Sequence, residues 1–300
     1  MARRIEEDIA KLSGLRGGGA AAAAGPLRKA LGDRVNLVVA KAADLAADLR
    51  VTELTPDLLT AFDRLFMNPI KSDPQCWGKK AIARALKDLD YDAAEPFLRG
   101  AAHIQLEPVW GGTADTAGPL RGICLLALPG CADIRREEVL RHLVDALAES
   151  DAAVRADAAR AFAAMGGDES ALVLRLKARL GDAESSVTGQ ALESLLVVER
   201  AAGLRFVQGF LHASGGEAAE EAALALGQSR LSGAVDALLA AWEPAEGEQY
   251  RESILRGLSL SRDDRALEFL QKLVREGRER DAKAARAALD LFPDSTATTG

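Results

Sequence analysis

The sequence predicts an all-α protein, an α-α superhelix built as a right-handed solenoid of about eight antiparallel helix pairs. Three observations predict this fold. About a fifth of the 300 residues are Ala and roughly one in seven is Leu, the residues with the strongest helix propensity. Aromatic residues make up only 4%, fewer than an all-β sandwich or barrel would require. An apolar helical pattern also recurs about every 32 residues, the period of stacked helical repeats.

The clearest copy of this pattern runs from Asp151 to Gly166. Asp151 is a favourable N-cap because its carboxylate can accept the free N–H groups of the first turn, and Gly166 is a favourable stop. The apolar side chains between them recur at helical spacing, so they share one helix face. These side chains are Val154, Ala158, Ala161, Phe162 and Met165.

The pattern repeats downstream, and a partner helix is expected between each two copies. The later copies begin at Val187, Ala218, Tyr250 and Asp281, and the intervening helices cover 170–180, 202–212, 231–242 and 265–276. Upstream, looser copies predict helices over 27–31, 35–49, 56–67, 79–89, 93–102, about 115–128 and 135–149. We therefore expect one solenoid over 26–293, with an N-terminal cap or flexible leader over 1–25. Its Gly/Ala run at 17–25 is interpreted as a linker or a frayed cap, and the tail at 294–300 is expected to be disordered.

The repeated motif, D-x-x-V-R-x-x-A-A-x-A-[FL] followed by Gly, resembles the HEAT repeat in its short form, known as PBS-lyase HEAT-like. The segment from Asp151 matches it through Val154, Arg155, Ala158, Ala159 and Ala161. The copies at Asp73 and Asp182 match in part. The resemblance covers roughly nine tenths of the chain and implies a curved stack whose second helices line the concave face. It implies no single function, because HEAT solenoids host many unrelated roles.

One segment breaks the period, an irregular insertion at about 103–118. The aperiodic stretch 103–122 contains two prolines that exclude a regular helix, and its polar side chains predict a loop that projects from one edge of the solenoid. In this interpretation Trp110 is an apolar anchor, and the polar residues contact a partner or transfer protons. In the alternative, Trp110 fills a gap between uneven repeats while Asp115 and Thr116 cap the next helix. The predicted partner-binding residues are Trp77, His103, Gln105, Glu107, Trp110, Asp115, Thr116, Arg121 and Arg155.

Charge, cysteines and motifs narrow the function. The net charge of −7 argues against nucleic-acid binding, because proteins that bind phosphate backbones are usually basic. The three cysteines form neither a disulfide framework nor a zinc motif, and His103 with Glu107 provides too few ligands for a metal. We find no signal peptide, no apolar run of membrane-spanning length and no nucleotide-binding or hydrolase motif. We therefore expect a cytoplasmic protein with no metal, cofactor or membrane contact.

Together these observations favour a non-catalytic scaffold that binds a protein partner on its concave face and on the irregular loop. Arginines that could contribute to that face are Arg84, Arg121, Arg155, Arg160 and Arg256. Two alternatives stay open. The first, which the resemblance implies, is an enzyme, either a tetrapyrrole lyase-like protein or another enzyme on a HEAT-like solenoid. The second is a HEAT-like protein that binds nucleic acid. The sequence does not identify the partner or the oligomeric state.

Overall fold

The fold is all-α, and the computed structural model describes residues 2–212 and 214–291. Helices account for 76% of the structure. Contacts between Cα atoms divide the chain into two compact units, Met1–Ala161 and Phe162–Gly300, which are described separately. The expectation of one continuous solenoid over 26–293 therefore stays a prediction, and the predicted disordered tail at 294–300 lies outside the described residues.

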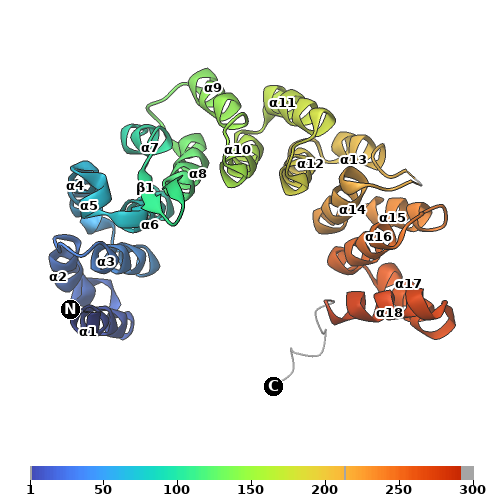
Figure 1. The fold of residues 1–300 in the computed structure, drawn as a ribbon, viewed down its shortest axis with the longest axis horizontal. Coiled ribbons are helices and arrows are strands. Elements are labelled where there is room, and N and C mark those ends of the chain that lie inside the picture. The colour runs from blue at the N-terminus through green and yellow to red at the C-terminus, as the bar shows by residue number, and fades with distance from the viewer. Residues whose placement is uncertain (1, 213, 292–300) are drawn as a thin grey trace. The chain divides into compact units, whose positions relative to one another are not determined.

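The first unit consists of stacked antiparallel helices (Figure 1). Helices α3, α6 and α8 form one layer and contact one another in sequence order, while α2, α4 and α7 cover them from the other side. Short 3-10 turns and the four-residue helix α5 (Pro69–Ser72) connect these layers. The longer helices are α1 (Ala2–Ser13), α2 (Gly19–Leu31), α3 (Asn36–Asp48), α4 (Thr55–Phe66), α6 (Trp77–Asp88), α7 (Glu95–Ala101), α8 (Gly118–Ala127) and α9 (Arg136–Ala146).

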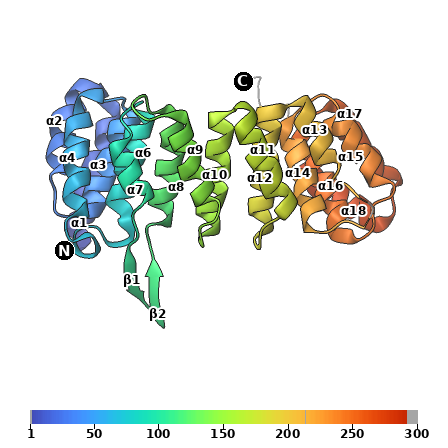
Figure 2. The same ribbon diagram turned by 90° about the horizontal axis from the view of Figure 1, so that it is seen from above.

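The second unit repeats the same two-layer arrangement with greater regularity. Helices α12, α14, α16 and α18 stack in one layer, and α11, α13, α15 and α17 form the other (Figure 2). Helix α10 (Ala152–Met165) contains the boundary between the units. The remaining helices are α11 (Gly167–Leu180), α12 (Ser185–Glu199), α13 (Ala201–Gln208), α14 (Glu217–Ser229), α15 (Ala234–Trp242), α16 (Glu248–Ser261), α17 (Asp264–Glu276) and α18 (Glu279–Asp290). The predicted all-α class with paired helices is thus confirmed.

The repeating apolar positions form the core, as their spacing predicts. Val154, Ala158 and Phe162 are inaccessible to solvent, and so are Val187 and Ala191 at the matching positions of the next copy. Small residues let neighbouring helices approach closely, so each layer is only about one side chain thick. The shortage of aromatics follows from this thin core, because no deep interior has to be filled.

The Gly/Ala run was wrongly predicted to be a linker or frayed cap, because it forms most of helix α2. Ala has the strongest helix propensity and offsets the cost of Gly19 and Gly25 at the two ends of the run. Ala23 and Ala24 are buried, so their small side chains allow close packing against α3. Composition suggested a flexible segment, whereas packing against α3 makes it part of the first unit.

The insertion also differs from the predicted irregular loop. It forms an antiparallel hairpin of strands β1 (Leu106–Val109) and β2 (Gly112–Asp115), which projects beyond the helices of the first unit (Figure 2). Val109 pairs with Gly112, so only Trp110 and Gly111 form the turn. Gly111 has a φ of +88°, a conformation that a residue without a Cβ adopts at little cost. A short strand accommodates Pro108, whereas Pro119 lies in the first turn of α8, where a proline does not interrupt the helix.

Candidate functional site

The hairpin reverses the usual relation between polarity and burial. Side chains alternate between the two faces of a strand, and normally the apolar face is buried. Here Gln105 and Glu107 are buried, with 2% and 8% of their surface exposed. Ile104 and Leu106 are instead 66% and 57% exposed, and Pro108 on the same face is also exposed. The hairpin is therefore attached to the unit through polar side chains and presents its apolar side chains to solvent.

Pro108 also closes one edge of the hairpin to further strand pairing. Thr116 donates its backbone N–H to the Gln105 carbonyl, which makes this a hydrogen-bonded pair of the antiparallel ladder. Hydrogen-bonded pairs alternate along the ladder, so Glu107 and Val109 occupy hydrogen-bonded positions, and Pro108 between them faces outward on the edge of β1. Because proline has no N–H, that edge offers an added strand one donor fewer. The hairpin thus favours side-chain contact over extension of its sheet from β1.

Gln105 is the centre of the polar network that anchors the hairpin. Its Oε1 accepts hydrogen bonds from Lys79 Nζ at 3.0 Å and His103 Nε2 at 3.1 Å. Its Nε2 donates to the carbonyl oxygen of Asp73 at 2.9 Å and to Glu107 Oε1 at 2.6 Å. Both ends of the amide are satisfied, so the network fixes the orientation of this side chain. The start of the hairpin is thereby tied to the N-terminus of α6.

The Glu107 carboxylate joins β1 to the turn before α6. Its Oε1 accepts the backbone N–H of Gln75 at 2.6 Å, the Thr116 hydroxyl at 2.8 Å and the Gln105 amide. Burial by itself would raise the pKa of Glu107, but these three hydrogen bonds stabilise the charged form and lower the pKa below its ordinary value. Glu107 is therefore an ionised structural acceptor rather than a proton donor near neutral pH.

The turn before α6 combines a buried ion pair with an uncommon backbone conformation. Lys79 Nζ lies 3.1 Å from Asp73 Oδ2, and neither side chain is accessible to solvent. The Asp73 carboxylate also accepts the backbone N–H groups of Gly78 and Lys79, which caps the helix. Between cap and helix, Gln75 and Cys76 have φ values of +60° and +54°. Left-handed residues cost about 1–3 kcal/mol each and tend to occur at functional sites.

A second ion pair supports the return strand. Arg121 NH1 donates to Asp115 Oδ2 at 2.6 Å, and Arg121 Nε donates to Glu149 Oε2 at 3.0 Å. The other oxygen of Asp115 accepts the backbone N–H groups of Gln105 and Ala117. Burial opposes ionisation of Asp115, but these hydrogen bonds and the guanidinium lower its pKa. Asp115 therefore joins both ends of the hairpin and accepts the N–H of Ala117, the residue before α8.

His103 is the third titratable group at the base of the hairpin. Its ring packs edge-on against Phe66, with 4.8 Å between ring centroids. Burial lowers its pKa, and the hydrogen bond to Gln105 opposes that shift only in part. The neutral imidazole is thus favoured near neutral pH, in a position where it donates to Gln105 Oε1.

The exposed part of the site is apolar. Trp110 occupies the tip of the hairpin and is fully exposed, and Val109 beside it is half-exposed. Trp77, 45% exposed, begins α6 just after the left-handed turn. Its indole N–H donates to Gln75 Oε1 at 3.1 Å, and Lys80 Nζ lies 5.2 Å from its ring centroid. The predicted tryptophans are therefore exposed, whereas Gln105, Glu107, Arg121 and Arg155 are buried, and His103, Asp115 and Thr116 lie partly exposed at the base of the hairpin.

The buried polar group does not have the arrangement expected of open partner contacts. Gln105, Glu107 and Arg121 are committed to hydrogen bonds within the chain. Arg155 is buried as well, and its guanidinium donates to the carbonyl oxygens of Glu149 and Ser150. The sequence showed that these residues are polar but not that they point inward. We therefore do not retain direct partner contact for them.

Two features of this site were not predicted from the sequence. Lys79 in α6 and Asp73 in the turn before it belong to a copy interpreted only through its repeat pattern, and nothing local indicated that both would be buried. The strand alternation of Ile104, Gln105, Leu106 and Glu107 was a readable signal, because it has the two-residue period of a strand. Among residues 2–212 and 214–291, no group of three or more His, Cys, Asp or Glu side chains is placed to hold a metal ion. In the same residues, no helix is both long and apolar enough to cross a membrane.

Comparison with known proteins adds only distant structural similarity. No protein-family model and no curated protein sequence matches the chain. Human deoxyhypusine hydroxylase is 17% identical, with a TM-score of 0.31 and coverage of 94% of this chain and 88% of that chain. Two engineered proteins are 17% and 18% identical, with TM-scores of 0.36 and 0.25. They cover 97% and 89% of this chain, and 94% of their own chains in both cases. All three TM-scores are below 0.5, so these similarities carry no argument about the function of this chain.

Proposed function

We propose that this chain is a non-catalytic, HEAT-like scaffold that binds a protein partner through the apolar surface of its hairpin. The HEAT-like assignment rests on the motif copies beginning at Asp151 and on the paired helices. The observation that supports binding is the reversed polarity of the hairpin, with Ile104 and Leu106 exposed over buried Gln105 and Glu107. Exposing several apolar side chains together opposes solubility unless a partner covers them.

Trp110 is the proposed anchor of this surface. An indole contributes a large apolar area with only two rotatable side-chain bonds, which makes it a frequent hot spot of protein interfaces. The base of the hairpin is held by charged hydrogen bonds, so the tip is presented in a defined position and little ordering is required on binding. Trp77 is included in the proposed surface because it is exposed on the element that the hairpin contacts.

Affinity purification from the native host tests this proposal, with the wild-type chain and Trp110→Ala compared by quantitative mass spectrometry. Trp110 is fully exposed, so its removal should leave the helicity unchanged. We expect a specific protein to be retained by the wild type and reduced about 30-fold or more with Trp110→Ala, the loss typical of a hot-spot residue.

Val197→Ala is the matched control, because Val197 is 66% exposed on α12 of the second unit. It should retain the same protein as the wild type. A photo-crosslinking residue at position 110 should also form a covalent adduct with that protein. Equal retention by Trp110→Ala, or turnover of a small molecule by a chain that captures nothing, would reject the scaffold proposal.

A further inference from the structure

Helix α11 exposes a stripe of leucines that is independent of the hairpin. Leu172, Leu176 and Leu180 are 68%, 60% and 75% exposed. They follow one another at four-residue spacing, so they occupy three consecutive turns of the same face. The opposite face of α11 carries the buried residues Leu174 and Ala178 and packs on α12. The stripe therefore lies on the side of the helix that points away from the core of its own unit.

This stripe needs an explanation, because isolated exposed leucines are common but aligned ones are not. Its ends are about 12 Å apart at 1.5 Å per residue, so it offers two full helical turns to a partner. The exposed apolar area is on the order of a few hundred Å², the size at which surface patches are often functional. The repeat pattern predicts the helix over 170–180 but not the exposure of its leucines.

The charges beside the stripe are distributed unevenly along α11. Arg175 is paired with Glu199 and Lys177 with Asp182, so both cations are neutralised within the unit. Asp168 in the first turn and Arg179 in the last turn have no ion pair among residues 162–212 and 214–291. The helix thus carries an unpaired acid at its N-terminal end and an unpaired base at its C-terminal end.

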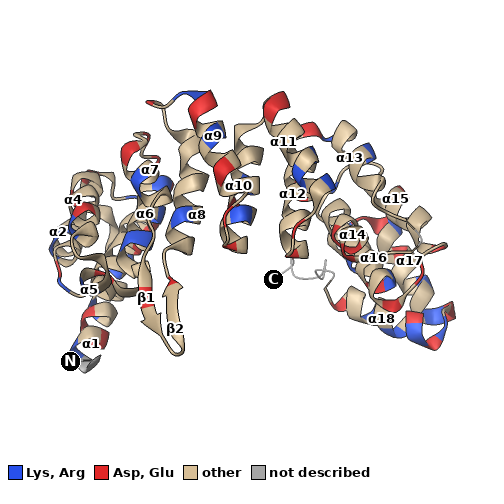
Figure 3. Ribbon diagram, turned by 45° about the horizontal axis from the view of Figure 1, so that its top comes forward, with Lys and Arg blue, Asp and Glu red and all other residues tan. Residues whose placement is uncertain are grey.

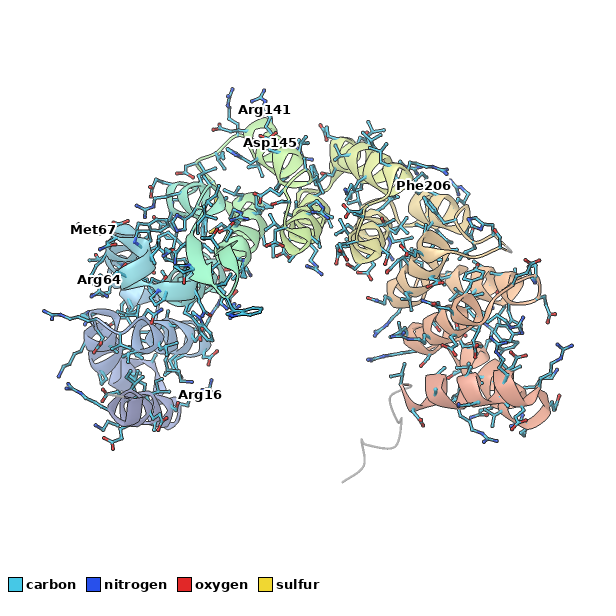
Figure 4. The ribbon with its side chains drawn as sticks, viewed as in Figure 1. Arg16, Arg64, Met67, Arg141, Asp145 and Phe206 are labelled. Carbon is cyan, nitrogen blue, oxygen red and sulfur yellow. The ribbon has the colours of Figure 1, made fainter. Side chains whose placement is uncertain are left out.

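Arg179 is held in place by aromatic rings rather than by an acid. Its guanidinium carbon lies 4.8 Å from the ring centroid of Phe206 and 5.2 Å from that of Phe210. Figure 4 shows Phe206 on α13, the helix that follows α11 in the same layer. Stacking keeps the guanidinium close to the surface of α11 while leaving its N–H groups free to donate. Arg179 is thereby positioned beside the leucine stripe.

We propose that this face of α11 is a dimer interface between two copies of the chain, with the two α11 helices antiparallel across a twofold axis. Such an axis places the leucines of one copy against those of the other, since an isologous interface uses the same surface twice. With the axis level with residue 174, Leu172 of each copy faces Leu176 of the other, and Leu180 lies towards the edge. The same register places Asp168 of each copy within about 1.5 Å, along the helix axis, of the level of Arg179 in the other copy, so the unpaired charges become complementary. A second copy of the chain necessarily carries both the leucine stripe and the acidic-to-basic order of charges that complement it, whereas an unrelated helix need not.

The size of the patch sets the expected strength of the dimer. A stable interface buries about 800 Å² on each partner, and the leucine stripe supplies less than this. We therefore expect a reversible dimer with a dissociation constant in the micromolar range, roughly 1–100 µM. Figure 3 shows both acidic and basic positions on the helices of the second unit.

Analytical ultracentrifugation of the full chain tests the proposal. The protein concentration is varied over a roughly thousand-fold range around the expected dissociation constant of the dimer. The wild-type mass should rise from 31.7 kDa towards twice that value. Leu176→Asp places a charge at the centre of the stripe and should keep the chain monomeric throughout. Val197→Asp, at another exposed apolar position of the second unit, should dimerise like the wild type. Circular dichroism confirms that each variant is folded.

Charge reversal tests the antiparallel geometry. Asp168→Arg alone and Arg179→Asp alone should each weaken the dimer about two- to fivefold or more at low salt, because each creates like-charged pairs. The double variant restores opposite charges across the axis and should recover most of that loss. A wild type that stays monomeric throughout, a Leu176→Asp chain that still dimerises, or a double variant no better than the single variants would overturn the proposal. Monomeric wild type that instead binds lipid vesicles through the stripe would likewise overturn it.

Discussion

The amine of Lys79 lies 3.1 Å from the Asp73 carboxylate, and both side chains are inaccessible to solvent. A buried ion pair of this kind often adds little net stability, because desolvation of both charges offsets their attraction. Its effect here is on geometry. Asp73 caps α6 and Lys79 donates to Gln105, so the pair couples the start of a helix to the base of the hairpin.

Lys79→Met should lower the free energy of unfolding by about 3–5 kcal/mol, because it leaves the Asp73 carboxylate buried without its counterion. Asp73→Asn in the wild-type background should also destabilise, since an amide has only one acceptor oxygen for the two N–H groups that cap α6. Urea denaturation followed by circular dichroism measures both losses.

The double variant Asp73→Asn/Lys79→Met separates ion pairing from packing. It removes both charges together, so its loss should be smaller than the sum of the two single losses by about 1 kcal/mol or more. Additive losses would mean that the two residues stabilise the fold independently and that their pairing is incidental.

Glu107→Gln should loosen the hairpin by about 1–3 kcal/mol. The carboxylate accepts from Gln75, Gln105 and Thr116 through one oxygen, and a neutral amide is a weaker acceptor for all three. Hydrogen exchange localises the effect, because the Gln75 amide should lose protection while amides in α14 and α16 keep theirs. Unchanged protection at Gln75 would contradict the role assigned to Glu107.

The stability of the first unit should fall as the pH falls below about 6.5 and fall further below about 4.5. His103 has a lowered pKa in the folded chain, so the unfolded chain takes up its proton first as the pH falls. Glu107 and Asp115 also have lowered pKa values in the folded chain. Their contribution to the free energy of unfolding is therefore complete above the ordinary carboxyl pKa. It is lost as the pH falls through the pKa values of the folded chain. Glu107→Gln should flatten the more acidic part of this dependence, measured as unfolding free energy against pH.

The repeat pattern predicted the helices because it combines two local signals. A cap such as Asp151 and a stop such as Gly166 mark the ends, and the apolar spacing marks the buried face. These signals act within one helix, so they can be read from one segment. Only the end of helix α2, 27–31, was predicted, because the preceding Gly/Ala run has no apolar periodicity and its order comes from packing against α3.

The hairpin could be predicted in part only. The two-residue alternation from Ile104 to Glu107 indicates a strand, but pattern rules then assign the apolar side chains to the core. The structure does the reverse because Lys79, Asp73 and Gln75 supply partners for the polar face. Those partners lie about 30 residues earlier in the chain, and nothing local to either segment shows that they meet. The inward direction of Arg121 and Arg155 depends on similar long-range contacts.

The three thiols should react slowly with an alkylating reagent at pH 8 in the folded chain. Burial raises the pKa of Cys76 to about 11 and that of Cys131 to about 11, and it raises the pKa of Cys124 further. The thiolate is the reactive form, so at pH 8 less than about 1% of each thiol would be available. Mass spectrometry of the alkylated chain, with a urea-unfolded sample as the reference, measures the protection. Rapid labelling of Cys76 in the folded chain would show that the turn before α6 opens readily.

Gly257→Ala should destabilise the second unit although alanine is the better helix former. Helices α14 and α16 meet through backbone, because a Cβ at Gly257 would overlap the carbonyl oxygen of Ala223, and one at Gly227 would overlap the backbone of Gly257. The helices would have to separate, at a cost of about 1–3 kcal/mol that exceeds the gain in helix propensity of about 1 kcal/mol. Gly25→Ala is the control, because Gly25 is an exposed residue of α2 with no atom near its Cβ position. Urea denaturation should show a neutral or stabilising effect for Gly25→Ala and a loss for Gly257→Ala, and equal effects would contradict the close approach of α14 and α16.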